Sequence, residues 1–393
     1  MTLRVGVVTV GRSDYGIYVP VLRRLQADKF FDLRLIVGAA HLEASQGSTL
    51  EEIEGDGFAV TAKVPMPLGG DTRADVAYAM GAGVREFASA YERLQPDLLV
   101  LIGDRYEMLA AAVAAVPFTI PMAHIHGGEL TFGAMDDAIR HAITKLSHLH
   151  FAATEEHAAR IRQMGEEAWR VHVTGSPAID SILEEQPVSR EELEKELRLD
   201  LSRTLLVTYH PVTLEKDPAE HIGNVLEALG QSGYSTLFTY ANADPSGSEI
   251  VRKVHEFTEH HEDARLVSSL GHRRYHGVQR YVAAMVGNSS SGLVEAASFR
   301  LPVVNIGARQ AGRTRAANVI DTGYSTEEIL RGIERAVSAE FRRSIASLKN
   351  PYGDGKAAER IVSVLKAMEL GPRLLQKRFA ELHEGREAKA RQS

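Results

Sequence analysis

The chain has 393 residues, with 45 Lys and Arg against 52 Asp and Glu, and 44% of its residues are apolar. This composition is typical of a globular protein with enough chain for two cores of ordinary size. The net charge of −7, without a long run of Lys or Arg, argues against nucleic acid or an anionic membrane as the main partner.

The absence of cysteine narrows the possible chemistry further. It excludes disulfides, thiolate metal sites and a cysteine nucleophile, and it suits a reducing compartment. The first residues run directly into a strand-like segment without the pattern of a signal peptide, so we expect a cytoplasmic protein. The one long uncharged stretch, 108–128, contains two prolines and two histidines, and it indicates helix, turn and strand instead of a membrane span.

Short apolar runs rich in β-branched residues alternate with helical patterns in the first half. The expected strands are Leu3–Val10, Leu33–Val37, Leu98–Ile102, Ile120–Ile125 and His150–Ala152, and the expected helices cover 17–27, 72–94, 136–147 and 155–164. This alternation predicts βαβ units and a parallel sheet covered on both faces.

Polar residues follow the predicted strands of this half. Arg12, after the first strand, is a candidate cation. The third strand is followed by Asp104, a candidate acid or base, and by Arg105, a candidate contact for an anion. Taken alone, Asp104 is more readily explained as the N-cap of the next helix.

The fourth predicted strand is followed by His126, two glycines and Glu129, which indicates either a close backbone approach to a ligand or a plain glycine turn. The next helix carries Asp136 and Arg140 on one face, where an ordinary surface ion pair is the alternative. Together, the three acids predict a crowded cluster. Because crowded carboxylates raise one another's pKa, the cluster predicts both a general acid and a general base near neutral pH.

A second alternating series follows a charged, helix-patterned segment at 183–201. Its expected strands are Thr204–Thr208, Thr236–Tyr240, Arg265–Val267, Met285–Val286 and Val303–Ile306, and its expected helices cover 216–230, 248–258, 275–284 and 290–298. We predict an α/β protein with two doubly wound domains, residues 1–183 and 184–356, and a helix over about 357–382 that packs back on the first domain. Ligands bind open parallel sheets at the carboxyl ends of the strands, so the site is expected in the cleft between the domains.

The second half supplies candidate anion-binding residues. Ser289 and Ser290 lie in a Gly-Asn-Ser-Ser-Ser-Gly segment between a strand and a helix, which indicates either a phosphate site at the helix N-terminus or a capped turn. Glu295 lies one turn into that helix. Arg309, with Arg313 and Arg315, forms either a source of charge for a diphosphate or a solvated basic loop.

Two further polar residues follow strands of the second half. His210 is a candidate phosphate donor or proton shuttle, and a structural histidine is the alternative. Asn242 is a weaker candidate, more readily explained as a turn residue. No Gly-x-Gly-x-x-Gly follows the first strand, and no P-loop, zinc-protease helix, Gly-x-Ser-x-Gly motif or ligand-like histidine spacing occurs, so we expect no cofactor and no metal.

Six segments form a specific combination in this order. They are Gly11–Gly16, Gly103–Glu107, His124–Glu129, Ile139–Ser147, Gly287–Gly292 and Gly307–Arg313. Together they resemble the UDP-N-acetylglucosamine 2-epimerase family, over roughly residues 3–370. The stretch Thr131–Asp137 is similar to the hydrolysing branch, which opens sialic-acid and legionaminic-acid biosynthesis. The resemblance implies a GT-B-like fold of two Rossmann-like domains, with the nucleotide held mainly by the second.

The resemblance also implies roles for individual residues. Asp104, Glu129 and Asp136 match the family's catalytic carboxylates. The positions that match or lie near its UDP contacts are Arg12 and Arg140 at the diphosphate, Glu295 at the ribose, Tyr275 at the uracil, and His210, Ser289, Ser290 and Arg309. The implied route is elimination of UDP to a 2-acetamidoglucal followed by addition of water. The implied partner is a UDP-sugar, and we expect a homodimer or homotetramer.

Three functions stay open at this point. A hydrolysing epimerase releases UDP and the free 2-epimeric sugar, whereas a non-hydrolysing epimerase returns the UDP-sugar. A glycosyltransferase or a nucleotide-sugar-binding regulator on the same fold is the third, since fold does not fix function. The sequence leaves the sugar open between N-acetylglucosamine and its 2,4-diacetamido-2,4,6-trideoxy analogue.

Overall fold

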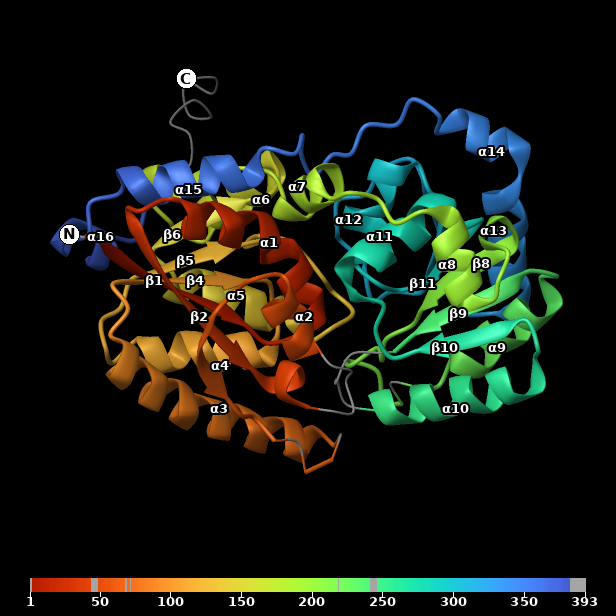
Figure 1. Cartoon of the computed structure of the whole chain (residues 1–393), viewed down its shortest axis with the longest axis horizontal. Helices are drawn as coiled ribbons and strands as arrows, with labels where there is room; N and C mark the ends of the chain where they lie inside the picture. Colours follow the sequence, from red (N-terminus) through yellow and green to blue (C-terminus); the bar gives the residue numbers. More distant parts are fainter. Residues whose placement is uncertain are drawn as a thin grey trace, which may run out of the picture.

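A computed structural model describes residues 2–43, 49–67, 69–70, 72–217, 219–240 and 246–381. The chain forms two lobes, each built on one parallel sheet (Figure 1). None of the helices in these ranges has the length and apolar character needed to cross a membrane. Asn242 lies outside the described residues, so its place in the site stays a prediction.

The first lobe has a seven-stranded sheet in the order β3-β2-β1-β4-β5-β6-β7. Its strands are β1 (Leu3–Thr9), β2 (Phe31–Gly38), β3 (Val60–Val64), β4 (Leu98–Ile102), β5 (Met122–Ile125), β6 (Leu149–Ala152) and β7 (Val171–Val173). Its helices are α1 (Arg12–Ala27), α2 (Thr49–Gly55), α3 (Arg73–Leu94), α4 (Tyr106–Ala115), α5 (Asp136–Leu146), α6 (Glu155–Gln163) and α7 (Pro177–Glu184). β3 and β7 were not predicted, because they are short and mix polar with apolar residues.

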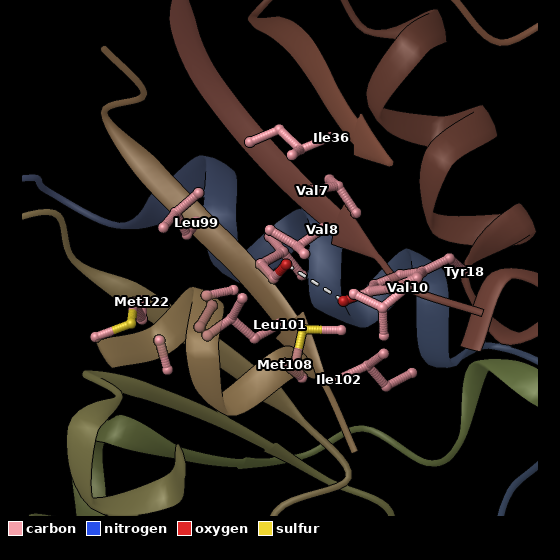
Figure 2. Packing of buried hydrophobic residues seen from close by; sticks show 14 of the residues in the cluster. Val7, Val8, Val10, Tyr18, Ile36, Leu99, Leu101, Ile102, Met108 and Met122 are labelled. Carbon is pink, nitrogen blue, oxygen red and sulfur yellow. Dashed lines mark hydrogen bonds between the residues drawn. The ribbon is translucent and has the colours of Figure 1, made fainter. Parts of the chain in front are cut away.

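The core of the first lobe shows why the sheet is covered on both faces. Val7 and Val8 are neighbours in β1 that point to opposite faces, and both are fully buried. Figure 2 shows the packing around them, with Leu99 and Leu101 from β4. The Tyr18 hydroxyl donates to a backbone carbonyl of β4 at 3.2 Å, so this large side chain is buried with its polar atom satisfied.

The second lobe has a six-stranded parallel sheet in the order β10-β9-β8-β11-β12-β13. Its strands are β8 (Thr204–Thr208), β9 (Ser235–Thr239), β10 (Ala264–Val267), β11 (Ala284–Gly287), β12 (Val303–Ile306) and β13 (Val319–Thr322). Leu205 and Val207 of β8 belong to one buried cluster, and Leu206 belongs to another. Since successive strand residues face opposite sides, this sheet also has a core on each face. The two sheets confirm the predicted doubly wound, GT-B-like class.

The helices of the second lobe include two beyond those predicted. They are α8 (Arg190–Leu197), α9 (Ile222–Gln231), α10 (Gly247–His260), α11 (Gly271–Tyr281), α12 (Ser291–Val294), α13 (Thr326–Val337) and α14 (Ala339–Ser344). The predicted helical segment 183–201 is wrong as one element, because α7 ends at Glu184 and α8 begins at Arg190. The chain crosses between the lobes there and returns between α14 and α15 (Figure 1).

The C-terminal segment differs from its prediction. The single helix expected over about 357–382 is α15 (Ala357–Ala367) followed by α16 (Pro372–Leu375). Gly371-Pro372 separates them, because proline cannot continue a helix but suits its first turn. α15 packs against α1 and α7 of the first lobe (Figure 1). The division of the chain at residue 183 stays a prediction.

Candidate active site

A cleft between the two lobes contains the predicted site. It is bordered by the carboxyl ends of β1, β4 and β5 on one side and of β8, β11 and β12 on the other. Within the described part of the chain, every predicted site residue lines it: Arg12, Asp104, Arg105, Glu129, Asp136, Arg140, His210, Tyr275, Ser289, Ser290, Glu295 and Arg309. The cleft therefore joins residues that are up to about 300 positions apart in the sequence, as expected for ligand sites at strand ends.

Asp104 reaches the cleft from the turn after β4. Gly103 has a φ of 71°, a left-handed conformation that glycine adopts without strain, and it turns the chain toward the cleft. The Asp104 carboxylate forms an ion pair with Arg140 and lies 3.5 Å from an Arg313 guanidinium nitrogen. The N-cap explanation is wrong, because the N-cap of α4 is Arg105.

Glu129 follows the glycine turn after β5 and is buried. Gly128 has a φ of 77°, and a Cβ there would lie 2.4 Å from a carbonyl oxygen of α6. Glu129 Oε1 lies 2.5 Å from His126 Nδ1, and Oε2 lies 3.3 Å from Arg313. Burial opposes ionisation, but His126 and Arg313 outweigh it and hold the pKa of Glu129 well below its ordinary range. The prediction that crowding raises the pKa of these acids is wrong for Glu129.

His126 is a residue of this site that the prediction did not assign. It has a φ of 65°, uncommon for a side chain other than glycine, and its ring bridges Glu129 and the Ser176 hydroxyl at 2.9 Å. Strained backbone of this kind clusters at functional sites. The signal in the sequence was the histidine at a strand end before two glycines.

Asp136 begins α5 and faces the second lobe. Its carboxylate lies 3.3 Å from an Arg309 guanidinium nitrogen, whereas Arg140, one turn further along α5, is fully buried and pairs with Asp104. The surface ion pair between Asp136 and Arg140 is therefore wrong. Each of the three predicted carboxylates faces an arginine from another element.

The second lobe holds His210 and Arg309 through backbone contacts. Asn288 accepts from the His210 N–H at 2.7 Å and donates to the His210 carbonyl at 2.9 Å. Burial, with Arg309 and other cations nearby, holds the pKa of His210 well below its ordinary value, so the ring is neutral and can donate but adds no charge. Arg309 donates to the carbonyls of Pro211 and Asn288, which fixes its direction.

Ser289 and Ser290 precede a helix that is shorter than expected. α12 has four residues and continues as a 3₁₀ turn over Ala296–Phe299. A helix dipole grows with aligned peptide units, so this element supplies hydroxyl and N–H donors with little macrodipole. The helix dipole therefore contributes less to anion binding at Ser289 and Ser290 than the sequence predicts.

Glu295 and Tyr275 each contact another polar side chain of the second lobe. Gln279 donates to Glu295 at 2.8 Å, and burial raises the pKa of Glu295. The Tyr275 hydroxyl lies 2.6 Å from the Ser291 hydroxyl. Their expected contacts to ribose and uracil stay predictions.

Arg12 and Arg105 complete the set from the first lobe. Arg12 donates across the cleft to the carbonyl of Ser268, and to that of Tyr240 at 2.6 Å. Arg105 pairs with buried Glu107 at 2.8 Å and lines the cleft.

In the described residues, no group of three or more His, Asp or Glu side chains is arranged to hold a metal ion.

Comparison with known proteins identifies the family of this chain. The family model described as UDP-N-acetylglucosamine 2-epimerase matches residues 23–366. The chain belongs to this family. A Legionella pneumophila relative named UDP-N,N'-diacetylbacillosamine 2-epimerase (hydrolyzing) is 36% identical, over 94% of this chain and 97% of its own. A Campylobacter jejuni relative named GDP/UDP-N,N'-diacetylbacillosamine 2-epimerase (hydrolyzing) is 37% identical, over 96% of this chain and 99% of its own.

The fold of this family is also seen in solved structures. The crystal structure of Neisseria meningitidis UDP-GlcNAc 2-epimerase bound to UDP-GlcNAc aligns with 93% of this chain and 100% of its own, with a TM-score of 0.79 and 19% identity. At that identity the likeness concerns the fold. It confirms the expected two-domain, GT-B-like architecture of the 2-epimerase family.

Arg313 is the most informative site residue that the prediction did not single out. The sequence places three arginines within seven residues, and only their side-chain contacts in the structure distinguish their roles. Arg309 faces Asp136, Arg313 faces Asp104 and Glu129, and Arg315 pairs with Asp321 of its own lobe.

Proposed function

We propose that this protein is a hydrolysing 2-epimerase, which eliminates UDP from a UDP-amino sugar, adds water and releases the free sugar with C2 inverted. The observation that carries the proposal is the arrangement of Asp104, Glu129 and Asp136 in one cleft opposite arginines of the second lobe. Membership in the 2-epimerase family and the names of the two relatives at 36% and 37% identity support it.

The proposed reaction begins with loss of the C2 proton. That proton is only weakly acidic, so a positioned base is required, and we assign the three carboxylates jointly to the proton transfers. As a carboxylate takes the proton, the C2–H electrons form a C1=C2 double bond, and the C1–O bond breaks with its electron pair on the diphosphate. UDP and a 2-acetamidoglucal result.

The second half-reaction hydrates the glycal. Water adds its hydroxyl to C1 while a proton returns to C2 from the opposite face, so the sum is UDP-sugar plus water to UDP plus the 2-epimeric sugar. Negative charge develops on the leaving diphosphate, and we assign its stabilisation to Arg12, Arg140, Ser289 and Ser290, with Arg309. Donors that are already held in place stabilise such charge without reorganisation.

For the sugar, we propose UDP-N,N'-diacetylbacillosamine, the 2,4-diacetamido-2,4,6-trideoxy substrate, because both of those relatives are named for it. UDP-N-acetylglucosamine is the second candidate. The product would then enter sialic- or legionaminic-acid-type biosynthesis. We further propose a cytoplasmic homodimer or homotetramer without a nucleic-acid or membrane partner, with a hinge near residue 183.

The test is incubation of the purified protein with each UDP-sugar in deuterium oxide. We expect the products to be UDP and a free 2-epimeric sugar with deuterium at C2. Chromatography measures the release of UDP, and NMR detects the deuterium in the sugar. Formation of a 2-epimeric UDP-sugar without UDP would indicate the non-hydrolysing reaction. Binding of both sugars without any turnover would indicate a regulator instead of an enzyme.

A further inference from the structure

Two loops from opposite lobes pack against each other beside the carboxylates. The loop after β5, residues 126–135, meets the loop after β12, residues 307–315, where the Phe132 N–H donates to the Ala311 carbonyl at 3.1 Å. A Cβ on Gly133 would lie 2.6 Å from the Ala308 oxygen. The two backbones are therefore in direct contact across the cleft.

Arg313 extends from the second of these loops into the first lobe. Its two terminal nitrogens lie 3.3 Å from Glu129 and 3.5 Å from Asp104, and its Nε donates to the Thr131 hydroxyl at 3.3 Å. The side chain is 9% exposed. All three nitrogens thus contact the lobe that carries the candidate catalytic acids.

We propose that Arg313 is a positioning residue for the proposed reaction, whose guanidinium aligns Asp104 and Glu129 and keeps them ionised when the two loops are in contact. The planar fork of arginine suits this task, because it holds two carboxylates in one geometry. The inference rests on the proposed function. It adds that the contact between the two loops controls the position and ionisation of Asp104 and Glu129.

The surroundings of the two acids explain why this cation matters. A buried carboxylate ionises only where charges or donors compensate for lost water. Of the arginines that face the pair, Arg140 comes from the first lobe and Arg313 comes from the second. The charged and titratable groups that face Asp104 and Glu129 in the described residues include His124, His126, Arg140, His157, Arg313 and Tyr352.

The experiment compares Arg313→Gln, Arg313→Lys and, as a matched control on the same loop, Arg315→Gln. Loss of Arg313 should lower kcat about 10- to 100-fold, the scale for misplaced catalytic groups. It should also move the acidic limb of the kcat–pH profile to higher pH, because a carboxylate without its cation ionises less readily. Arg313→Lys should restore part of both effects, and Arg315→Gln should keep the wild-type profile.

Calorimetry separates positioning from binding. UDP affinity of Arg313→Gln is expected within about threefold of wild type, since a positioning residue acts on the transition state. An unchanged acidic limb with kcat close to wild type would overturn the inference while leaving the proposed function intact. An equal loss of UDP affinity and kcat would reassign Arg313 to binding.

A second variant keeps the test decisive if Arg313→Gln does not fold. Gly133→Ala adds a methyl group where the loops touch and removes no charge, so it should push Arg313 away and move the acidic limb in the same direction. A wild-type profile in Gly133→Ala would contradict the coupling.

The inference also has a readout that needs no turnover. In a carbon-13 NMR titration of side-chain-labelled glutamate, Glu129→Gln identifies the Glu129 signal, and Arg313→Gln should shift its titration to higher pH. If the wild type releases no UDP from any UDP-amino sugar, the proposed function fails and this titration still decides the role of Arg313.

Discussion

Each predicted catalytic acid faces an arginine, and at Glu129 the surrounding charges also decide the direction of the pKa shift. Glu129 is 1% exposed and its pKa is held well below the ordinary range, although burial alone would raise it. At Glu129 the balance falls to the nearby charges, because His126 and Arg313 lie close enough to its carboxylate to offset the desolvation. The site is thus a set of acid–arginine contacts at strand ends, and Glu129 does not have the raised pKa expected for crowded acids.

Replacement of a carboxylate by its amide tests the proposed chemistry. Asp104→Asn or Glu129→Gln should lower turnover by about 100-fold or more, the usual scale for a positioned acid or base. UDP binding should persist, because the amides keep the size of the side chains and leave every proposed UDP contact in place, including Arg140, which pairs with Asp104. The measurements are UDP release and calorimetric UDP affinity.

Asp97 offers a matched control for Asp104. It precedes β4, whereas Asp104 follows that strand, and it is ion-paired with Arg4 at 2.7 Å. Asp97→Asn should retain wild-type turnover, since it lies at the opposite end of the strand from the cleft. Wild-type turnover in Asp104→Asn would remove that residue from the mechanism.

Arg309 tests the nucleotide side of the site. Arg309→Ala should weaken UDP binding by roughly 1.5–3 kcal/mol, the range for hydrogen bonds to charged groups. Arg315→Ala is the control, because Arg315 pairs with Asp321 in its own lobe. Isothermal titration with UDP measures both, and equal affinities for Arg309→Ala and wild type would place Arg309 outside the UDP site.

At the scale of elements, the turn after β11 places Ser289 and Ser290. Gly287 ends that strand with a φ of 137°, and a Cβ there would lie 2.0 Å from the Thr208 carbonyl oxygen of β8. Both the left-handed conformation and the close approach require glycine. The end of β11 packs directly against the backbone of β8 at Gly287. This close approach allows the turn that carries Ser289 and Ser290 to face the cleft.

Gly287→Ala should therefore lower the free energy of unfolding by about 2–4 kcal/mol, from backbone strain and steric overlap. Gly81→Ala is the control, because Gly81 lies inside α3 with open space around its Cα. That change should raise the free energy of unfolding by about 0.5–1 kcal/mol through helix propensity. Chemical denaturation measures both, and equal stability of Gly287→Ala and wild type would contradict the strain.

At the scale of the whole molecule, His272 connects the lobes. Its Nδ1 lies 2.8 Å from Glu52 of α2, and its Nε2 lies 3.1 Å from Glu185, which follows α7. Burial disfavours the charged ring, but Glu185 and Glu52 outweigh it and raise the pKa of His272 to about 9. The pKa values of both glutamates are lowered in turn.

This contact predicts a pH dependence of stability. Because the folded pKa of His272 is raised above 6.5, its contribution is complete below pH 6.5 and is lost as the pH rises through about 9. The contribution of the glutamates is lost at acidic pH, below their ordinary value of 4.5. The contact is therefore strongest between these limits.

Thermal unfolding of wild type and His272→Gln across the pH range measures the effect. We expect the stability difference to be up to about 3 kcal/mol near pH 6 and to shrink toward pH 9.5. Tm values that differ by a constant amount across this range would contradict a charged His272 in the contact. His261→Gln is a control, because that ring stacks on Phe257 within its own lobe.

Several features of this protein are determined by local sequence. The strand β4 and its turn to Asp104 follow from five consecutive apolar residues and a glycine, because a strand buried on both faces needs such a run. Shorter buried strands precede Glu129 and Ser289 as well, although β5 includes His124 and β11 ends in its own glycine. The parallel alternation then brings these strand ends to one edge of each sheet, so the positions of the candidate acids were predictable from the sequence.

Only the tertiary structure decided which groups face each other. Arg309, Arg313 and Arg315 share one local pattern, yet they contact Asp136, the Asp104–Glu129 pair and Asp321 respectively. The low pKa of Glu129 and the high pKa of His272 likewise come from charges brought close by folding. Short-range patterns determine where a chain is buried and where it turns, whereas electrostatic energy depends on distances between segments far apart in sequence, and the packing of the two lobes sets those distances.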